Sequence, residues 1–249
     1  QLQLYVDSQQ RFLDGWLEAL RNHLGGGVLY SRPWYLMVGL PGSGKSSLVH
    51  RANTANKLNA RLSSELRSAA SDQKVDCWLG DDAVIIDPKG ELLMQASSDL
   101  ESEAVKNERL WQHLLNWLTE SRKRQPLNGV VLTLDLGWLS SATVAERKMG
   151  AQLLRARLLD ISGTLNTRLP VYFVMTRLDM LNGFNDFYQQ LDKETRQSLL
   201  GVTFSTQSEG LQAWLGELET FWDRWIDGLN DNLADKMLPW TGETGAADI

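Results

Sequence analysis

The feature that most limits the fold of this chain is a glycine-rich segment, Gly39-Leu40-Pro41-Gly42-Ser43-Gly44-Lys45-Ser46. It has the complete P-loop pattern, and it lies between the short apolar run Trp34 to Val38 and a stretch of helical character, Ser47 to Ala60. In such a setting the backbone N–H groups of the loop point inward at a helix N-terminus and form a nest for phosphate oxygens. The alternative is a glycine-rich turn without a ligand. The pattern and its flanks favour a nucleotide-binding fold.

The polar positions of the P-loop have separate expected roles. Lys45 would reach the β- and γ-phosphates, and the Ser46 hydroxyl would be a ligand of Mg²⁺. The expected nucleotide contacts are Gly39, Pro41, Gly42, Ser43, Gly44, Lys45, Ser46 and Ser47. The sequence therefore predicts GTP or ATP with Mg²⁺ as the bound cofactors.

A second segment fits the part of a GTPase that senses the γ-phosphate. Asp87-Pro88-Lys89-Gly90 follows the apolar run Val84 to Ile86, which is the place of the D-x-x-G element. Asp87 would hold the Mg²⁺ shell through water, and the Gly90 N–H would contact the γ-phosphate. The alternative is an ordinary turn at the end of a strand. The order after the P-loop favours the nucleotide interpretation.

A third segment fits the element that recognises the base. Thr176-Arg177-Leu178-Asp179 follows another apolar run, where GTPases carry N/T-K-x-D. Asp179 would accept two hydrogen bonds from guanine, and the planar guanidinium of Arg177 could stack on a base, although arginine and lysine are not interchangeable. Thr203-Phe204-Ser205 could supply a further loop at the base edge. These residues favour guanine over adenine.

The composition excludes several other classes of protein. In 249 residues, 43% are apolar and 22% are charged, as in a soluble globular protein, and the net charge of −6 gives no general case for binding nucleic acid or anionic membranes. The single cysteine, Cys77, rules out an internal disulfide. No run approaches 18 apolar residues, so no membrane span is expected, and the first residue, Gln1, suggests an excised or processed fragment. We interpret His113 as structural, and Arg122-Lys123-Arg124 as cations that suit a helix C-terminus.

The order of apolar runs predicts an α/β protein. Helices are expected over residues 1–24, 108–122 and 142–167, and strands over 34–38, 75–79, 83–87, 129–134 and 171–175. Gly80-Asp81-Asp82 predicts a hairpin. The result is a P-loop NTPase fold of small-GTPase type: a mostly parallel sheet with an antiparallel edge, helices on both faces, and amphipathic helices at both ends.

Three regions are expected along the chain. Residues 1–30 form an N-terminal helix and a glycine-rich joint, residues 31–206 the GTPase-like domain, and residues 207–249 a C-terminal helical extension with a loose tail. The extension carries a broad apolar stripe from Leu211 to Leu229. This stripe either packs on the rest of the protein or forms a docking face for another protein.

Taken together, several runs resemble the IcmF/TssM family over about residues 33–187. These runs are 33–39 with the P-loop, 75–79, 83–87, 125–130, 169–172, 176–179 and 181–184. The resemblance implies a cytoplasmic GTPase-like domain of an inner-membrane subunit of the bacterial type VI secretion system. It further implies that the parent protein is membrane-anchored and that TssL, baseplate subunits and TssA are partners.

Two departures from the family pattern affect the expected activity. Asp87-Pro88-Lys89-Gly90 stands where the family has Asp-Thr-Ala-Gly, and Pro88 removes a backbone donor. The family also tends to carry a threonine before the strand at 75–79, where only Ser71 is nearby in this chain. In addition, no residue is an evident positioner of the attacking water: Glu91, just after Gly90, has the wrong charge to orient water beside a triphosphate. We therefore expect a nucleotide-binding switch and scaffold with slow or partner-stimulated hydrolysis. The alternatives are a vestigial GTPase-like fold that acts only as an interaction scaffold, and a free-standing P-loop ATPase.

Overall fold

The computed structural model describes residues 2–25, 28–52, 73–94, 101–191, 193–197, 201–205 and 210–237. The chain forms two compact units, Gln1–Leu178 and Asp179–Ile249. Three predicted features lie wholly or mostly outside the described residues: the continuation of the P-loop helix to Ala60, the glycine-rich joint, and the tail after residue 240. The predicted domain boundaries at 30/31 and 206/207 stay predictions.

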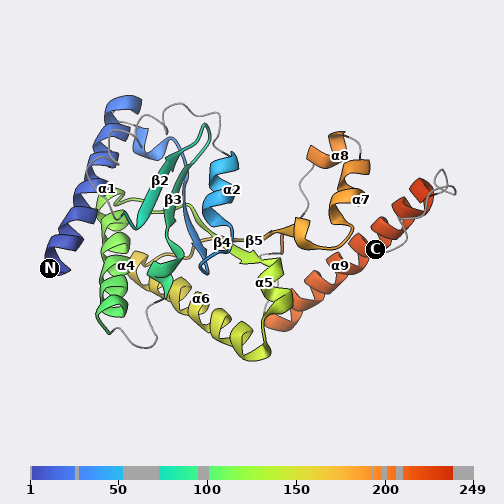
Figure 1. The fold of residues 1–249 in the computed structure, drawn as a ribbon. Helices are drawn as coiled ribbons and strands as arrows, with labels where there is room; N and C mark the ends of the chain where they lie inside the picture. Colours follow the sequence, from blue (N-terminus) through green and yellow to red (C-terminus); the bar gives the residue numbers. More distant parts are fainter. Residues whose placement is uncertain are drawn as a thin grey trace. The chain divides into compact units, whose positions relative to one another are not determined.

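The first unit is built on a five-stranded mixed sheet with the strand order β2-β3-β1-β4-β5 (Figure 1). The strands are β1 (Trp34–Gly39), β2 (Val75–Leu79), β3 (Val84–Pro88), β4 (Gly129–Asp135) and β5 (Val171–Thr176). All neighbours are parallel except β2 and β3, which form the predicted antiparallel hairpin at one edge. The prediction of an α/β protein with a mostly parallel sheet is thus confirmed.

The helices of this unit follow the predicted pattern, with differences at their ends. They are α1 (Leu2–Leu24), η1 (Val28–Tyr30), α2 (Lys45–Ala52), η2 (Gly90–Leu93), α4 (Glu101–Ser121), α5 (Leu136–Ser141) and α6 (Val144–Leu165). None of the helices in the described ranges is long and apolar enough to cross a membrane.

Two helix boundaries were predicted wrongly. α4 begins at Glu101, whereas the sequence predicted Glu108. The first turns were missed because they carry no apolar stripe. In these turns Lys106 pairs with Glu103, one turn away, at 2.6 Å. α6 begins at Val144 rather than Ala142. The Thr143 side chain accepts a hydrogen bond from the Glu146 N–H, and the Glu146 carboxylate accepts one from Thr143 N. This capping box separates α6 from the short α5.

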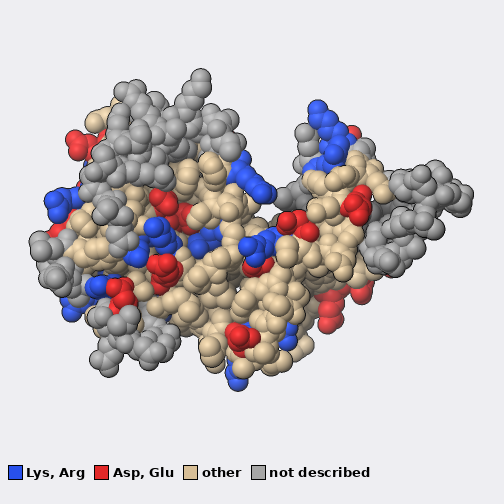
Figure 2. Space-filling model, in the orientation of Figure 1, with Lys and Arg blue, Asp and Glu red and all other residues tan. Residues whose placement is uncertain are grey.

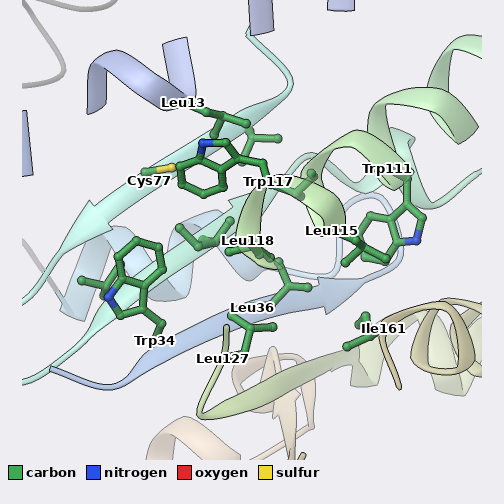
Figure 3. Packing of buried hydrophobic residues seen from close by; sticks show 14 of the residues in the cluster. Leu13, Trp34, Leu36, Cys77, Trp111, Leu115, Trp117, Leu118, Leu127 and Ile161 are labelled. Carbon is green, nitrogen blue, oxygen red and sulfur yellow. The ribbon is translucent and has the colours of Figure 1, made fainter. Parts of the chain in front are cut away.

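One hydrophobic core fills the side of the sheet covered by α1 and α4 (Figures 1 and 3). Alternate strand residues such as Leu36 and Val38 face this core, as the period of two requires. α1 contributes five buried apolar side chains, those of Phe12, Leu13, Trp16, Leu17 and Leu20. Trp34 lies between Trp16 and Trp117, with ring centroids 5.7 and 6.3 Å away. The N-terminal helix is therefore part of the same core as the sheet.

The opposite side of the sheet carries α2. Met37 of β1 and Val49 of α2 are buried but do not belong to the core cluster, which fits a separate contact on this side. The rings of Tyr35 and Tyr172 meet edge to face at 5.8 Å. Along β5, Val171, Tyr172 and Phe173 are each about half exposed. On the face of the first unit that is in view, Lys and Arg side chains lie among Asp and Glu side chains (Figure 2).

Arg122 differs from the prediction for the basic cluster. It follows α4, as expected, but its side chain is only 1% exposed. Its guanidinium lies over the rings of Tyr30 and Trp34, at 5.1 and 4.8 Å, and donates to the carbonyl oxygen of Pro126 and to Asn128 Oδ1. Burial lowers the pKa of Arg122 to about 10. Arg122 is a core residue, whereas Lys123 and Arg124 are exposed.

In the described residues of the second unit, the regular secondary structure is helical. It contains η3 (Leu178–Met180, which begins at the unit boundary), α7 (Phe184–Gln190), α8 (Lys193–Gln197) and α9 (Leu211–Met237). α9 confirms the predicted C-terminal helix. Phe204 packs on Trp214 of α9 at 5.0 Å, and the Ser205 N–H donates to Glu217.

Candidate functional site

The predicted P-loop connects β1 to α2 and has the backbone that its glycines allow. Gly42 and Gly44 have φ values of 78° and 80°, a region that residues with a Cβ rarely adopt. The Ser43 N–H donates to the Leu40 carbonyl oxygen at 3.0 Å and closes the turn. Lys45 is the first residue of α2, so the loop ends at a helix N-terminus.

The polar side chains predicted to bind magnesium and phosphate lie together. Ser46 Oγ donates to Asp87 Oδ2 at 2.6 Å, which joins the start of α2 to the end of β3. Lys45 is 5% exposed and donates to the Gly39 carbonyl oxygen at 3.4 Å. The other oxygen of Asp87, Oδ1, is buried and has no hydrogen-bond partner among the described residues. The structure thus brings together Ser46 and Asp87, which the sequence predicts for one site and which are 41 positions apart.

Burial changes the proton affinity of both charged groups. It raises the pKa of Asp87, an effect that the Ser46 hydrogen bond and the Lys45 charge oppose and that nearby Asp76 increases. Burial also lowers the pKa of Lys45, against the opposite effect of Asp87. Asp76 lies directly across the hairpin from Asp87. Each charged form is therefore held at a cost, which is a common sign of a functional site.

Gly90 lies against the P-loop. A Cβ atom at this position would be 2.7 Å from both the N and the Cα of Pro41. Only glycine fits so close to another stretch of backbone. The segment after Asp87 therefore reaches the P-loop, as the predicted contact of Gly90 with a γ-phosphate requires.

Two threonine hydroxyl groups tie the P-loop to the neighbouring strands. Thr133 Oγ1 of β4 is 2.9 Å from Ser43 Oγ, and Thr176 Oγ1 of β5 donates to the Ser43 carbonyl oxygen at 2.8 Å. Thr176 was predicted as a base-site residue, whereas Thr133 was missed. The only signal for Thr133 was a polar residue within the apolar run of β4.

Arg177 makes an ion pair that the sequence did not reveal. Its Nη1 is 2.9 Å from Oδ2 of Asp135, the last residue of β4, whose carboxylate is 9% exposed. Asp135 Oδ1 accepts hydrogen bonds from the N–H groups of Gly137 and Trp138 and so caps α5. Arg177 has a φ of 59°, a strained value for a residue with a side chain.

The remaining predicted residues are placed as follows. Ser47 lies on the exposed side of the first turn of α2. Asp179 lies in η3, at the start of the second unit, so its role in base recognition stays a prediction. Thr203, Phe204 and Ser205 also belong to the second unit.

The residues present suit Mg²⁺ bound together with a phosphate. In the described part of the chain no three His, Cys, Asp or Glu side chains are grouped as a self-contained metal site. Mg²⁺ needs no such group, because proteins usually hold it by one or two oxygen ligands, water and substrate phosphates. Ser46 Oγ and Asp87, with its unpartnered Oδ1, provide such oxygens beside the Lys45 ammonium group.

Comparison with known proteins settles the family. The model of the IcmF-related N-terminal domain matches residues 104–247, which is more than half of the chain. The chain belongs to the IcmF/TssM family. A curated protein of Pseudomonas aeruginosa, the type VI secretion system component TssM1, is 32% identical over 189 residues, or 74% of this chain. This chain spans only 17% of that relative's length.

Within this IcmF/TssM chain, the region matched by the family model contains β4, β5 and α9 but not the P-loop. Glu91 also makes a contact that the sequence did not predict. Its carboxylate pairs with the Lys74 ammonium group at 3.1 Å, just before β2. Glu91 therefore has a structural partner on the hairpin.

Proposed function

We propose that this chain is a nucleotide-binding switch and scaffold module of a type VI secretion membrane complex. It binds GTP in preference to ATP, with Mg²⁺, in a P-loop NTPase fold. The observation that carries the proposal is the group formed by Lys45, Ser46 and Asp87. In this group a buried carboxylate keeps one oxygen without a described partner, next to a buried ammonium group and a hydroxyl.

The group formed by Lys45, Ser46 and Asp87 lowers the stability of the free protein, but it would favour a complex with Mg²⁺ and a nucleotide. A buried carboxylate oxygen without a partner loses free energy relative to water, on the order of 1–3 kcal/mol or more. Magnesium supplies the charge that removes this cost, and the N–H groups of the P-loop supply donors for phosphate. Lys45 would bind the outer phosphates, and Ser46 and Asp87 would bind the metal directly or through water.

Hydrolysis by this module is slow unless a partner assists it. Phosphoryl transfer depends almost wholly on positioning and electrostatic stabilisation. Glu91 follows Gly90, but its carboxylate pairs with Lys74 and has the wrong charge to orient water beside a triphosphate. Pro88 also removes one backbone donor from the same segment.

Membership in the IcmF/TssM family supports a proposal for the place of the module in the cell. The name of the P. aeruginosa relative supports a role in type VI secretion. On that basis the module lies on the cytoplasmic side of the inner membrane as part of a membrane-anchored parent protein. It connects that protein to baseplate subunits, with TssL and TssA as further partners.

A second function is favoured by the hydrogen bonds that the residues of the site make to one another. Lys45 donates to the Gly39 carbonyl oxygen, and Ser46 donates to Asp87, so the chain's own groups meet several needs of the site. The alternative is therefore a vestigial GTPase-like fold that acts only as an interaction scaffold.

Equilibrium titration with a fluorescent GTP analogue distinguishes the two functions. The switch predicts Mg²⁺-dependent binding that Lys45→Ala weakens by about 100-fold or more, since the ammonium group would face two phosphates. Lys148→Ala removes an exposed lysine on α6 and is the matched control. A folded wild-type protein that binds no nucleotide at millimolar concentration with Mg²⁺ leaves only the scaffold.

A further inference from the structure

The end of β5 is fixed beside the P-loop by contacts within the first unit. Thr176 Oγ1 donates to the carbonyl oxygens of Ser43 and Leu134, at 2.8 and 3.2 Å. A Cβ atom placed on Gly44 would lie 3.4 Å from the Thr176 side chain. The residue that follows, Arg177, therefore leaves the sheet next to the P-loop.

This position is where the base of a bound nucleotide would lie. In open α/β sheets, ligands bind beyond the carboxyl ends of the strands. With its phosphates on the P-loop, a nucleotide would extend past the ends of β4 and β5, which are Asp135 and Thr176. Arg177 and Asp135 are thus the charged pair at this edge of the sheet.

Asp135 makes hydrogen bonds both to the backbone of α5 and to the side chain of Arg177. One carboxylate oxygen accepts two backbone hydrogen bonds from the start of α5, and the other pairs with Arg177. Arg177 would otherwise be a long, half-exposed side chain on a strained backbone, free to adopt many rotamers. The ion pair to a nearly buried carboxylate favours the rotamers that keep the guanidinium beside Asp135.

We propose that Asp135 is a positioning residue for the purine base, acting through Arg177. Its carboxylate holds the planar guanidinium of Arg177 at the edge of the P-loop, where a purine ring stacks on it. This inference rests on the proposed nucleotide binding. Stacking and cation–π attraction recognise a purine by its π face, so the pair contributes to the affinity for the base and not to that for the phosphates.

The substitution Asp135→Asn separates the two roles of this residue. Asparagine is as good a helix cap as aspartate, because its amide oxygen accepts the same backbone hydrogen bonds. Its amide NH₂ group would then face the donor Arg177 in place of a carboxylate oxygen. The variant should keep the cap of α5 and release Arg177. Arg177→Gln, at a position whose side chain is 54% exposed, removes the guanidinium itself without touching the core.

The test compares GTP with tripolyphosphate, a ligand that has the phosphates but no base, by calorimetric titration in Mg²⁺. We expect Asp135→Asn and Arg177→Gln each to weaken GTP binding about five- to tenfold and to change tripolyphosphate binding by less than about twofold. In the double variant the loss should equal that of Arg177→Gln alone, because Asp135 acts through Arg177. The same variants should also reduce the preference for GTP over CTP.

Four results would overturn the inference. If wild-type protein binds both ligands and either single variant keeps wild-type affinity for GTP, Asp135 does not position the base through Arg177. If Asp135→Asn weakens both ligands equally, it acts on the P-loop or on stability. If the losses of the two single variants add fully in the double variant, the residues act independently. If wild-type protein binds neither ligand, the proposed function itself fails, and this inference fails with it.

Discussion

Replacing Gly90 with alanine tests the close contact between the segment after β3 and the P-loop. An added Cβ would lie 2.7 Å from the N and Cα of Pro41, whereas atoms in ordinary contact are about 3.5 Å apart. The two backbones must therefore separate by about 0.8 Å, and neither can rotate away as a side chain would. Strain of this kind costs about 1–3 kcal/mol, and at 2 kcal/mol lowers Tm by about 4–8 °C.

The same displacement should impair ligand binding, since Gly90 is the residue expected at the γ-phosphate. A shift of this size at a binding loop can cost on the order of 100-fold. Thermal unfolding and titration with a non-hydrolysable GTP analogue give the two readouts. Gly163→Ala on α6 is the matched control, because nothing lies within 4 Å of its added Cβ, and it should be neutral or slightly stabilising. A Gly90→Ala protein with the Tm of the control would show that the contact is not rigid.

Two further predictions concern buried cations. Arg122→Met should lower the free energy of unfolding by about 3 kcal/mol, because it removes two ring contacts and two hydrogen bonds. The control, Lys123→Met, should have no effect. Urea unfolding measures both variants. Equal unfolding curves for the two variants would contradict this. For Lys45, burial lowers the pKa from its ordinary value of 10.5, so the charged form costs stability below the lowered pKa and the cost disappears as pH rises towards 10.5. The free energy of unfolding of Lys45→Met should therefore exceed that of wild type at pH 7, and this difference should disappear near pH 10.5. Urea unfolding that shows the same difference between variant and wild type at both pH values would refute the reasoning.

The sheet and part of the candidate site could be predicted from the sequence because their signals are local. Apolar runs marked all five strands, and Gly80-Asp81-Asp82 marked the hairpin, where the Gly80 N–H now donates to the Ala83 carbonyl oxygen. The P-loop pattern with its flanks predicted Lys45 and Ser46. Asp87 followed from its place at the end of a strand.

The rest of the site depends on pairs that are distant in the sequence. Thr133 and Ser43 are 90 residues apart, and Asp135 and Arg177 are 42 residues apart. Thr133 is a polar residue within the apolar run of β4, and Asp135 ends that strand, but neither belongs to a motif like D-x-x-G that would single it out. The role of Arg122 was missed for the same reason: with Lys123 and Arg124 it was predicted to suit the helix C-terminus, and only the fold reveals that its guanidinium lies over the rings of Tyr30 and Trp34.

Because α1 is part of the hydrophobic core, removing it should affect the rest of the protein. A truncated protein that starts at the P-loop strand would keep every predicted nucleotide contact, but it would uncover Trp34 and Trp117, which are 1% and 3% exposed in the intact chain. Two tryptophans newly in contact with water at one surface favour aggregation. Failure of such a fragment to bind GTP would therefore report on its solubility and not on its chemistry.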